Sequence, residues 1–148
     1  EGFFSLLNIE KASHIYLFEC ENEWIDALKA TFAPWIHKIT IVQAFVSDKN
    51  SDNSIVLGDY IKKNEIKVDF IKMDIEGAEM KALKGAEQTL IKHRPQLAIS
   101  IYHSNNDMQD IPIYLHNILK NYIFKIGQYS PDNDETIFYA IPEELYVK

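Results

Sequence analysis

A lysine and three carboxylates stand close together where an apolar segment of the sequence ends. Lys72, Asp74 and Glu76 occupy alternate positions across the end of the segment 68–73, and Glu79 follows three residues later. Alternate residues of a strand share one face, so Lys72 and Asp74 are expected side by side at the end of a buried strand. Because a buried charge is costly unless it is paired, we expect these two groups to contact each other or a ligand. The alternative interpretation, first-turn acids of a following helix, accounts for Glu79 fully and for Glu76 in part.

A histidine follows the next apolar segment, 96–102. In open parallel sheets ligands bind at the carboxyl ends of the strands, which is where His103 is expected. Histidine titrates near neutral pH, so it can take a proton from a hydroxyl group or help to hold a metal ion. A lone histidine is more often structural, but the position of His103 beside the strand that carries Asp74 favours a functional role. The other histidines are interpreted as structural: His14, His37, His93 and His116.

Polar residues also follow the first two apolar segments, 14–19 and 38–46. Glu19 ends the first segment, and an acid at such a strand end commonly binds the hydroxyls of a ribose. The alternative for Glu19 is a solvated loop acid. Ser47 and Asp48 follow the second segment and could hydrogen-bond an adenine edge, but they are also ordinary turn residues, the interpretation favoured by the sequence.

The elements that must position these residues alternate between strands and helices. Four short segments are apolar at both parities, as is typical of buried parallel strands: 14–19, 38–46, 68–73 and 96–102. Apolar residues at spacings of three and four predict helices between them, the third beginning near Asn106 or Asp107. Two further strands, 122–127 and 136–141, flank a turn at 130–134 and predict a hairpin. We therefore expect an α/β fold with a mostly parallel sheet and one antiparallel strand near its edge.

The composition excludes several classes of protein. The chain has 148 residues, of which 47% are hydrophobic and 25% charged, and this predicts one globular domain over 1–148. Its 22 acidic residues outnumber its 15 basic residues, and Arg94 is the sole arginine. We therefore expect neither a nucleic acid nor a membrane as partner. The single cysteine, Cys20, excludes an internal disulfide and fits a cytoplasmic location.

Several motifs together resemble the signature of the FkbM-type methyltransferases. The decisive stretch is FIKMDIEGAE at 70–79, and the supporting motifs are LKGA at 83–86, Arg94-Pro95 and IYH at 101–103. The resemblance covers nearly the whole chain. It implies a Rossmann-like fold and S-adenosylmethionine as cofactor, with methyl transfer to a hydroxyl oxygen on a sugar or another natural product. The expected acceptor is a hydroxyl group of a small molecule or a glycan.

The same resemblance assigns roles to individual residues. His103 is the preferred base for the hydroxyl proton, and Glu76 is the alternative. Asp74 is expected to face the reacting centre, and Lys72 belongs to the same catalytic set. A metal ion bridging Asp74, Glu76 and His103 is a weaker alternative, so we predict no metal site. The residues expected at the cofactor are Gly2, Phe3, Glu19, Ser47, Asp48 and Asp74.

The start of the chain departs from the family pattern. The family's first strand and its glycine-bearing loop, a DxGAN-like sequence, normally stand immediately before the residues that match 2–5. We therefore expect the chain to be a fragment of a longer enzyme, with this strand and loop upstream of Glu1. Two other functions remain open: a nicotinamide-dependent oxidoreductase, and a non-catalytic binding module that retains the fold.

Overall fold

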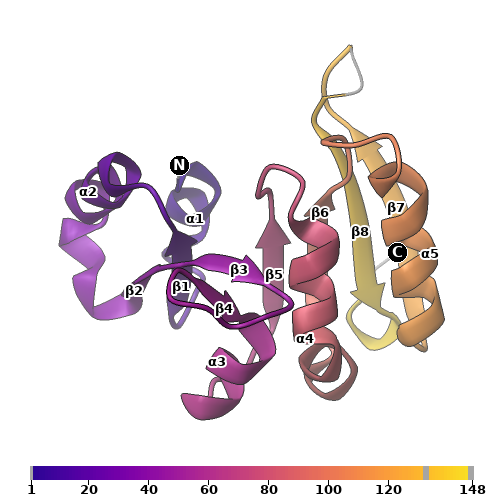
Figure 1. Cartoon of the computed structure of the whole chain (residues 1–148), viewed down its shortest axis with the longest axis horizontal. Helices are drawn as coiled ribbons and strands as arrows, with labels where there is room; N and C mark the ends of the chain where they lie inside the picture. The colour runs from indigo at the N-terminus through magenta and orange to yellow at the C-terminus, as the bar shows by residue number, and fades with distance from the viewer. Residues whose placement is uncertain (1, 132–133, 147–148) are drawn as a thin grey trace. The chain divides into compact units, whose positions relative to one another are not determined.

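The computed structural model describes residues 2–131 and 134–146. The chain forms two compact units, the first made of Glu1–Val46 and Ser51–Ser54 and the second of Ser47–Asn50 and Ile55–Lys148. Figure 1 shows the elements of both units, and each unit is described by itself. In the part of the chain that is described, no helix has the length and apolar character needed to cross a membrane. The single domain over 1–148 stays a prediction.

The first unit is organised around two parallel strands. β1 (Ile15–Glu19) pairs with β2 (Ile39–Gln43), and Glu19 is the last residue of its strand, opposite Gln43. The helices of this unit are α1 (Phe3–Asn8), α2 (Asn22–Thr31) and a 3₁₀ helix at Ala33–Lys38. The core of this unit consists of Ile9, Leu28, Phe32 and Ile39. The strand pairing therefore places Glu19 at the carboxyl end of β1, as the sequence predicts.

A mixed sheet organises the second unit. Its strands follow the order β5-β6-β8-β7, where β5 is Phe70–Met73, β6 is Gln96–Ser100, β7 is Tyr122–Gln128 and β8 is Thr136–Pro142. β5 and β6 are parallel, whereas β8 is antiparallel to both of its neighbours. Because β5 and β6 run in the same direction, the loops that follow them leave the sheet at the same edge. Asp74 and His103 lie on these two loops.

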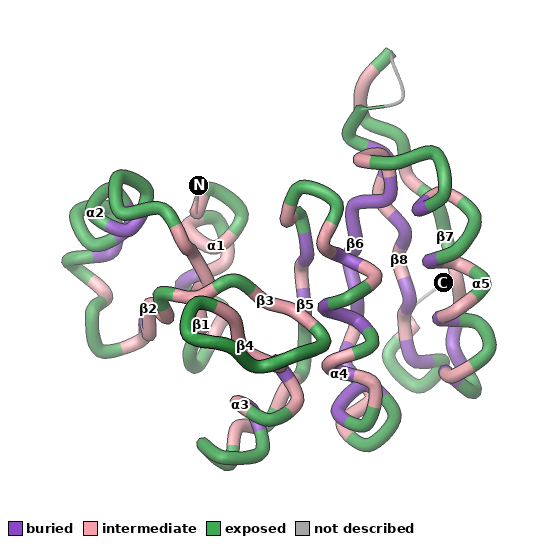
Figure 2. Tube along the Cα trace, viewed as in Figure 1, coloured by how far each residue is buried: buried purple, intermediate pink, exposed green. Residues whose placement is uncertain are grey.

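Three α-helices and a 3₁₀ helix complete the second unit: α3 (Leu57–Lys63), α4 (Glu79–His93), α5 (Asp107–Ile118) and the 3₁₀ helix Glu143–Leu145. α4 and α5 pack against each other beside the sheet, as Figure 1 shows. Their apolar residues recur at spacings of three and four, so that Leu83, Leu90, Ile111 and Leu115 are fully buried. Figure 2 shows that buried residues also follow β6 and β8. The first residue of α4, Glu79, is buried and follows closely on the loop that carries Asp74.

Two glycines allow α3 and α4 to approach each other closely. A Cβ atom at Gly58 would lie 2.6 Å from the backbone oxygen of Gly85. A Cβ atom at Gly85 would in turn collide with the backbone oxygen of Ser47. The contact of Ser47 with α4 therefore requires glycine at position 85.

The strands differ from the prediction in two respects. The segment 38–46 divides into β2 and β3 (Phe45–Ser47), because the Ala44 amide donates to the carbonyls of both Glu19 and Val42 and turns the chain. β3 pairs with β4 (Ser54–Val56), a strand that we did not predict. The α/β class and the β7–β8 hairpin are confirmed. However, the described strands form three sheets rather than one mostly parallel Rossmann-like sheet.

Two predictions about particular segments remain. The strand and glycine loop expected upstream of Glu1 stay a prediction. Of the predicted turn at 130–134, Asp132 and Asn133 lie outside the described residues.

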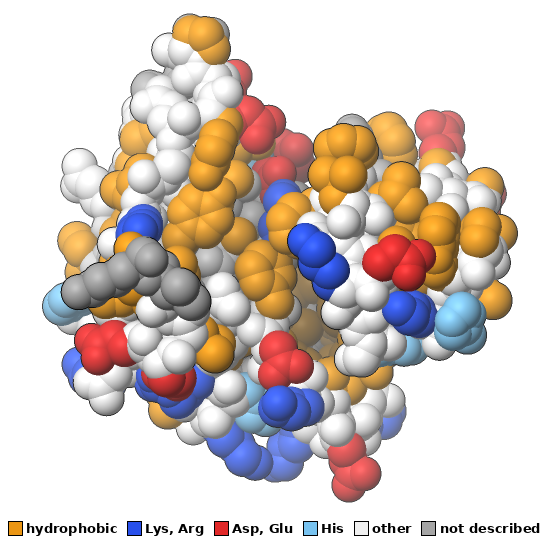
Figure 3. Space-filling model, turned by 180° about the vertical axis from the view of Figure 1, so that it is seen from behind, with side chains coloured by type: hydrophobic (Ala, Val, Ile, Leu, Met, Phe, Trp, Pro, Cys, Tyr) orange, Lys and Arg blue, Asp and Glu red, His pale blue; other side chains and the backbone are white. Residues whose placement is uncertain are grey.

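Aromatic side chains cover part of the hairpin that β7 and β8 form. Tyr129 folds over Gly127, where a Cβ atom would lie 2.7 Å from the tyrosine hydroxyl. The hydroxyl of Tyr139 donates to that of Tyr129 at 2.9 Å. Figure 3 shows hydrophobic side chains along this projecting hairpin. Tyr129 thus packs within its own hairpin although 65% of it is exposed.

The sole arginine has a structural role at the other end of α4. The guanidinium of Arg94 donates to the carbonyl of Lys120 at 2.7 Å and to that of Asn121 at 3.0 Å. It also pairs with the carboxylate of Glu144 at 2.9 Å. Arg94 therefore joins the end of α4 to the segments on either side of the hairpin.

Candidate functional site

The first pair predicted from the sequence is present at the end of β5. The Lys72 ammonium donates to Asp74 Oδ2 at 3.0 Å, and the Tyr102 hydroxyl donates to Asp74 Oδ1 at 3.1 Å. Burial raises the pKa of Asp74, but the hydrogen bond and positive charge of Lys72, together with hydrogen bonds from Ser100 and Tyr102, outweigh it, so this pKa lies below the usual value. The carboxylate is therefore charged at neutral pH and is held by Lys72 of β5 and by Tyr102 of the loop after β6. The predicted contact between Lys72 and Asp74 is confirmed.

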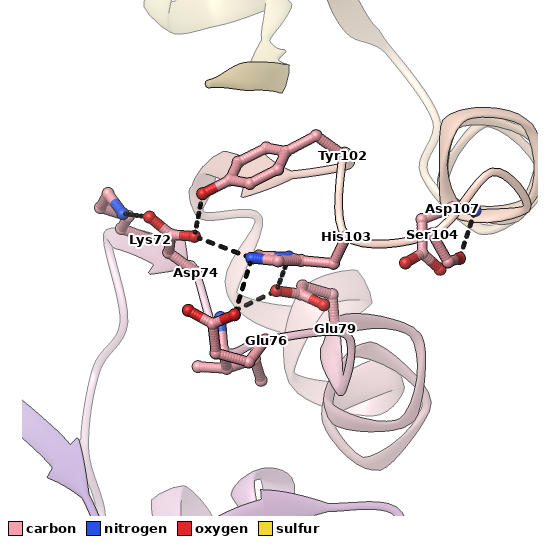
Figure 4. Close-up of polar contacts among 9 residues, drawn as sticks. Lys72, Asp74, Glu76, Glu79, Tyr102, His103, Ser104 and Asp107 are labelled. Carbon is pink, nitrogen blue, oxygen red and sulfur yellow. Dashed lines mark hydrogen bonds and ion pairs between the residues drawn. The ribbon is translucent and has the colours of Figure 1, made fainter. Parts of the chain in front are cut away.

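His103 lies against this pair, as Figure 4 shows. Its Nε2 atom is 3.6 Å from Asp74 Oδ1 and 3.6 Å from Glu76 Oε2. Only 9% of its side chain is exposed, and its ring stacks at a tilt on Tyr102 with the centroids 4.2 Å apart. The structure thus brings His103, Asp74 and Glu76 together, as expected from the ends of two adjacent parallel strands.

Glu79 is a site residue that the sequence interpretation missed. Its side chain is completely buried at the first turn of α4, and its Oε1 atom lies 3.0 Å from His103 Nδ1. The same oxygen accepts a hydrogen bond from the Ile75 amide at 2.8 Å. These contacts go beyond those of a first-turn acid stabilised by the helix dipole. One signal was present in the sequence: Glu79 precedes Ala82 and Leu83 by three and four residues, so it lies on the apolar side of the helix.

The loop between β5 and α4 has an unusual backbone. Glu76 has a φ of 55° and Gly77 a φ of 89°, both in the left-handed region. For a residue other than glycine this conformation costs about 1–2 kcal/mol, and such strain is concentrated at functional sites. The side chain of Glu76 is 91% exposed, so its carboxylate approaches His103 from the solvent side. The turn through residues 76 and 77 therefore brings a third carboxylate to the imidazole.

Residues predicted to bind a cofactor lie in both units. In the first unit, Glu19 Oε1 accepts hydrogen bonds from the amides of Cys20 at 2.7 Å and Glu21 at 3.0 Å, which orient its carboxylate at the end of β1. Gly2, with a φ of 75°, caps α1, and Phe3 is 70% exposed. The roles of these residues stay predictions.

The other predicted adenine contacts, Ser47 and Asp48, belong to the second unit. The Ser47 hydroxyl donates to Asp48 Oδ1 at 3.3 Å, and the Asp48 side chain is exposed. This local contact is typical of a turn, the interpretation that the sequence favours. Their binding to adenine stays a prediction.

A comparison with models of known protein families finds a match that covers these residues. The model of the methyltransferase FkbM domain matches residues 29–134. The chain belongs to the FkbM methyltransferase family. That match includes the β5 end, the start of α4 and the His103 loop. The nicotinamide-dependent oxidoreductase expected as an alternative is not favoured by this membership.

A solved structure supports the same assignment. The chain is similar to the crystal structure of methyltransferase FkbM from Methylobacillus flagellatus KT, with a TM-score of 0.76 and 26% sequence identity. The similarity covers 86% of this chain and 36% of that chain. No curated protein matches the sequence. The fold is therefore shared with a family member that is considerably longer than this chain.

Proposed function

We propose that this chain forms part of an S-adenosylmethionine-dependent methyltransferase that methylates a hydroxyl oxygen of a sugar or another small molecule. The observation that carries the proposal is the meeting of Asp74, Glu76 and His103 at one sheet edge, in a chain of this family. Ligands bind at this edge in open α/β sheets. The site therefore combines the expected location with groups that accept protons.

The proposed cofactor fits the polar groups that the chain offers. S-adenosylmethionine supplies a methyl group on a positively charged sulfur. The carboxylate of Glu19 is oriented by two backbone amides, and a carboxylate is the group that accepts hydrogen bonds from both hydroxyls of a ribose. Ser47 and Asp48 are proposed to hold the adenine. The charged carboxylate of Asp74 is proposed to face the methionine portion of the cofactor, and Gly2 and Phe3 are proposed to bind the cofactor.

The reaction requires the acceptor hydroxyl to lose a proton. As the acceptor oxygen bonds to the methyl carbon, the bond from that carbon to sulfur breaks, so alignment supplies most of the acceleration. His103 and Glu76 are the two groups in the cluster proposed to take the proton, with His103 preferred. Lys72 and Tyr102 fix Asp74, which in turn faces His103 Nε2.

Calorimetry with S-adenosylhomocysteine tests the cofactor assignment on the complete protein. The Glu19→Ala variant should bind it about 10–100-fold more weakly, because a hydrogen bond to a charged group contributes about 1.5–3 kcal/mol. Glu21→Ala, which removes an exposed acid two residues away, is the matched control and should bind like the wild type. Equal affinities of the Glu19→Ala variant and the wild type would remove Glu19 from the ribose site.

A second variant tests the chemical step. His103→Gln should bind S-adenosylhomocysteine normally but transfer radiolabelled methyl groups to hydroxylated acceptors about 100-fold more slowly or worse, the usual contribution of a general acid–base group. His116→Gln, in the exposed part of α5, is the control. Methyl transfer by His103→Gln at the wild-type rate would contradict the assignment.

A further inference from the structure

The cluster around His103 contains buried polar atoms that lack hydrogen-bond partners. Among the residues that the structure describes, these atoms are Glu79 Oε2, His103 Nδ1 and His103 Nε2. Nδ1 lies 3.0 Å from Glu79 Oε1 but without the alignment of a hydrogen bond. Buried polar groups are almost always satisfied, and each exception costs about 1–3 kcal/mol. A group that satisfies several of these atoms at once would therefore be strongly bound.

Three side chains converge at the same place from three different segments. Asp74, Glu79 and His103 can each offer one ligand atom, and these atoms all lie within 4.8 Å of one another. Glu79 is fully buried, His103 is 9% exposed, and the Asp74 side chain is 32% exposed. Figure 4 shows the imidazole between the carboxylates, with the Glu79 carboxylate beside the ring. The arrangement is thus closed on the protein side and accessible beside Asp74.

The charge at this point favours a positive ligand. Lys72 is already paired with Asp74, while Glu79 and Glu76 bring further negative charge to the two sides of the imidazole. A buried carboxylate is costly unless a counter-charge lies close to it. A cation in contact with Asp74 and Glu79 would supply that charge and would use the unpartnered atoms of Glu79 and His103.

We infer that Asp74, Glu79 and His103 form a binding site for one divalent transition-metal cation. Two carboxylates and one imidazole suit Mn²⁺ or Zn²⁺, whereas Mg²⁺ and Ca²⁺ prefer oxygen ligands throughout. On sequence grounds, a metal held by Asp74, Glu76 and His103 is the weaker alternative. The inferred ligand set contains the buried Glu79 instead of the exposed Glu76.

A bound cation would change which residue of the cluster takes the proton of the acceptor. A ring nitrogen of His103 that held a metal would have no lone pair left for a proton, so Glu76, the alternative base on the solvent side, would take the proton of the acceptor. A bound cation would lower the pKa of a hydroxyl group that approaches it. This consequence for catalysis rests on the proposed methyl transfer, whereas the binding site itself rests only on the residues of this chain.

Titration of the metal-free complete protein with MnCl₂, followed by electron paramagnetic resonance, tests the site. We expect one saturable site per chain, with competition by ZnCl₂. Glu79→Gln and His103→Gln should each weaken Mn²⁺ binding at least about 100-fold, since even the partners behind metal ligands contribute about 10–100-fold. Asp69→Asn is the matched control, because Asp69 is an exposed acid of the same unit and should not affect binding.

A measurement on the unaltered protein covers the case in which a variant fails to fold. Mn²⁺ should broaden the imidazole NMR signals of His103 at lower concentrations than those of His116, which is exposed on α5. Absence of saturable binding of Mn²⁺ and Zn²⁺, or broadening of His116 before His103, would overturn the proposal. Binding of S-adenosylhomocysteine is measured separately, so failure of the methyltransferase assignment would leave this result unchanged.

Discussion

The imidazole of His103 is surrounded by the carboxylates of three residues. Glu79 faces Nδ1 from the start of α4, while Asp74 and Glu76 face Nε2 from the loop after β5. An imidazole so placed can carry a proton between carboxylates or bind a cation with them. Lys72 pairs with Asp74 and contributes to keeping that carboxylate charged.

Replacement of Lys72 by methionine should raise the pKa of Asp74. The variant removes the hydrogen bond and positive charge of Lys72, the largest influences that lower this pKa, and leaves burial, which raises it, and the weaker hydrogen bonds from Ser100 and Tyr102. Carbon-13 NMR titration of the Asp74 carboxyl group measures the shift. Lys67→Met is the control, since Lys67 pairs with the exposed Asp69 instead. An unchanged Asp74 pKa in Lys72→Met would mean that Lys72 does not stabilise the carboxylate.

The contacts of individual residues could be predicted only where local spacing determines them. Lys72 and Asp74 are two residues apart at the end of β5 and the start of the loop that follows it, so strand alternation alone predicts that they meet. The burial of Glu79 depends instead on how α4 packs against the sheet and on the loop after β6, which returns His103 to the same point. The residues next to Glu79 in the sequence do not specify such long-range packing. Only the apolar residues Ala82 and Leu83 indicate that Glu79 lies on the buried side of the helix.

At the scale of elements, α4 connects the cluster to the rest of the second unit. Its first turn provides Glu79, its middle contacts α3 and Ser47 through Gly85, and its last residues lead to Arg94. The close approach at Gly85 is the part of this arrangement that is most sensitive to a change in volume.

Gly85→Ala should therefore destabilise the fold. In an ordinary helix, alanine in place of glycine stabilises by about 0.5–1 kcal/mol. Here the added methyl group meets the backbone oxygen of Ser47, and overpacking of this kind costs about 1–3 kcal/mol. Urea denaturation gives the free energy of unfolding, and Lys84→Ala, at an exposed position of the same helix, is the control. A gain in stability would show that α4 does not approach Ser47 so closely.

The elements themselves were largely predictable, because apolar periodicity reflects burial along the chain. The helix predicted to begin near Asn106 or Asp107 begins at Asp107, directly after Asn106. The division of 38–46 at Ala44 was not predictable, since it depends on a hydrogen bond to the carbonyl of Glu19, in a different strand. Pairing between strands likewise depends on contacts that periodicity does not specify.

At the scale of the whole molecule, alkaline pH should reduce stability through buried tyrosines. Burial raises the pKa of Tyr122 from 10.0 to about 12, and its hydroxyl donates to the Pro95 carbonyl at 3.1 Å. In this interval the folded chain keeps a proton that the unfolded chain releases, so the free energy of unfolding decreases as pH rises.

The decrease can be assigned by comparison with the Tyr122→Phe variant. Urea denaturation is measured from neutral pH up to the highest pH at which the protein stays folded. The free energy of unfolding should decrease less steeply with pH in the variant, with a difference in slope of at most about 1.4 kcal/mol per pH unit. The neutral-pH values of both proteins provide the baseline. Parallel curves for the two proteins would show that Tyr122 makes no contribution.

The left-handed backbone at Glu76 lowers the stability of the loop but places a carboxylate beside His103. Glycine adopts that backbone without penalty, as it does at the neighbouring position 77, so selection for heat resistance alone would favour a second glycine there. With glutamate at position 76 the loop is less stable, but it carries an exposed carboxylate next to His103. Laboratory evolution toward higher melting temperature should therefore discard this carboxylate early.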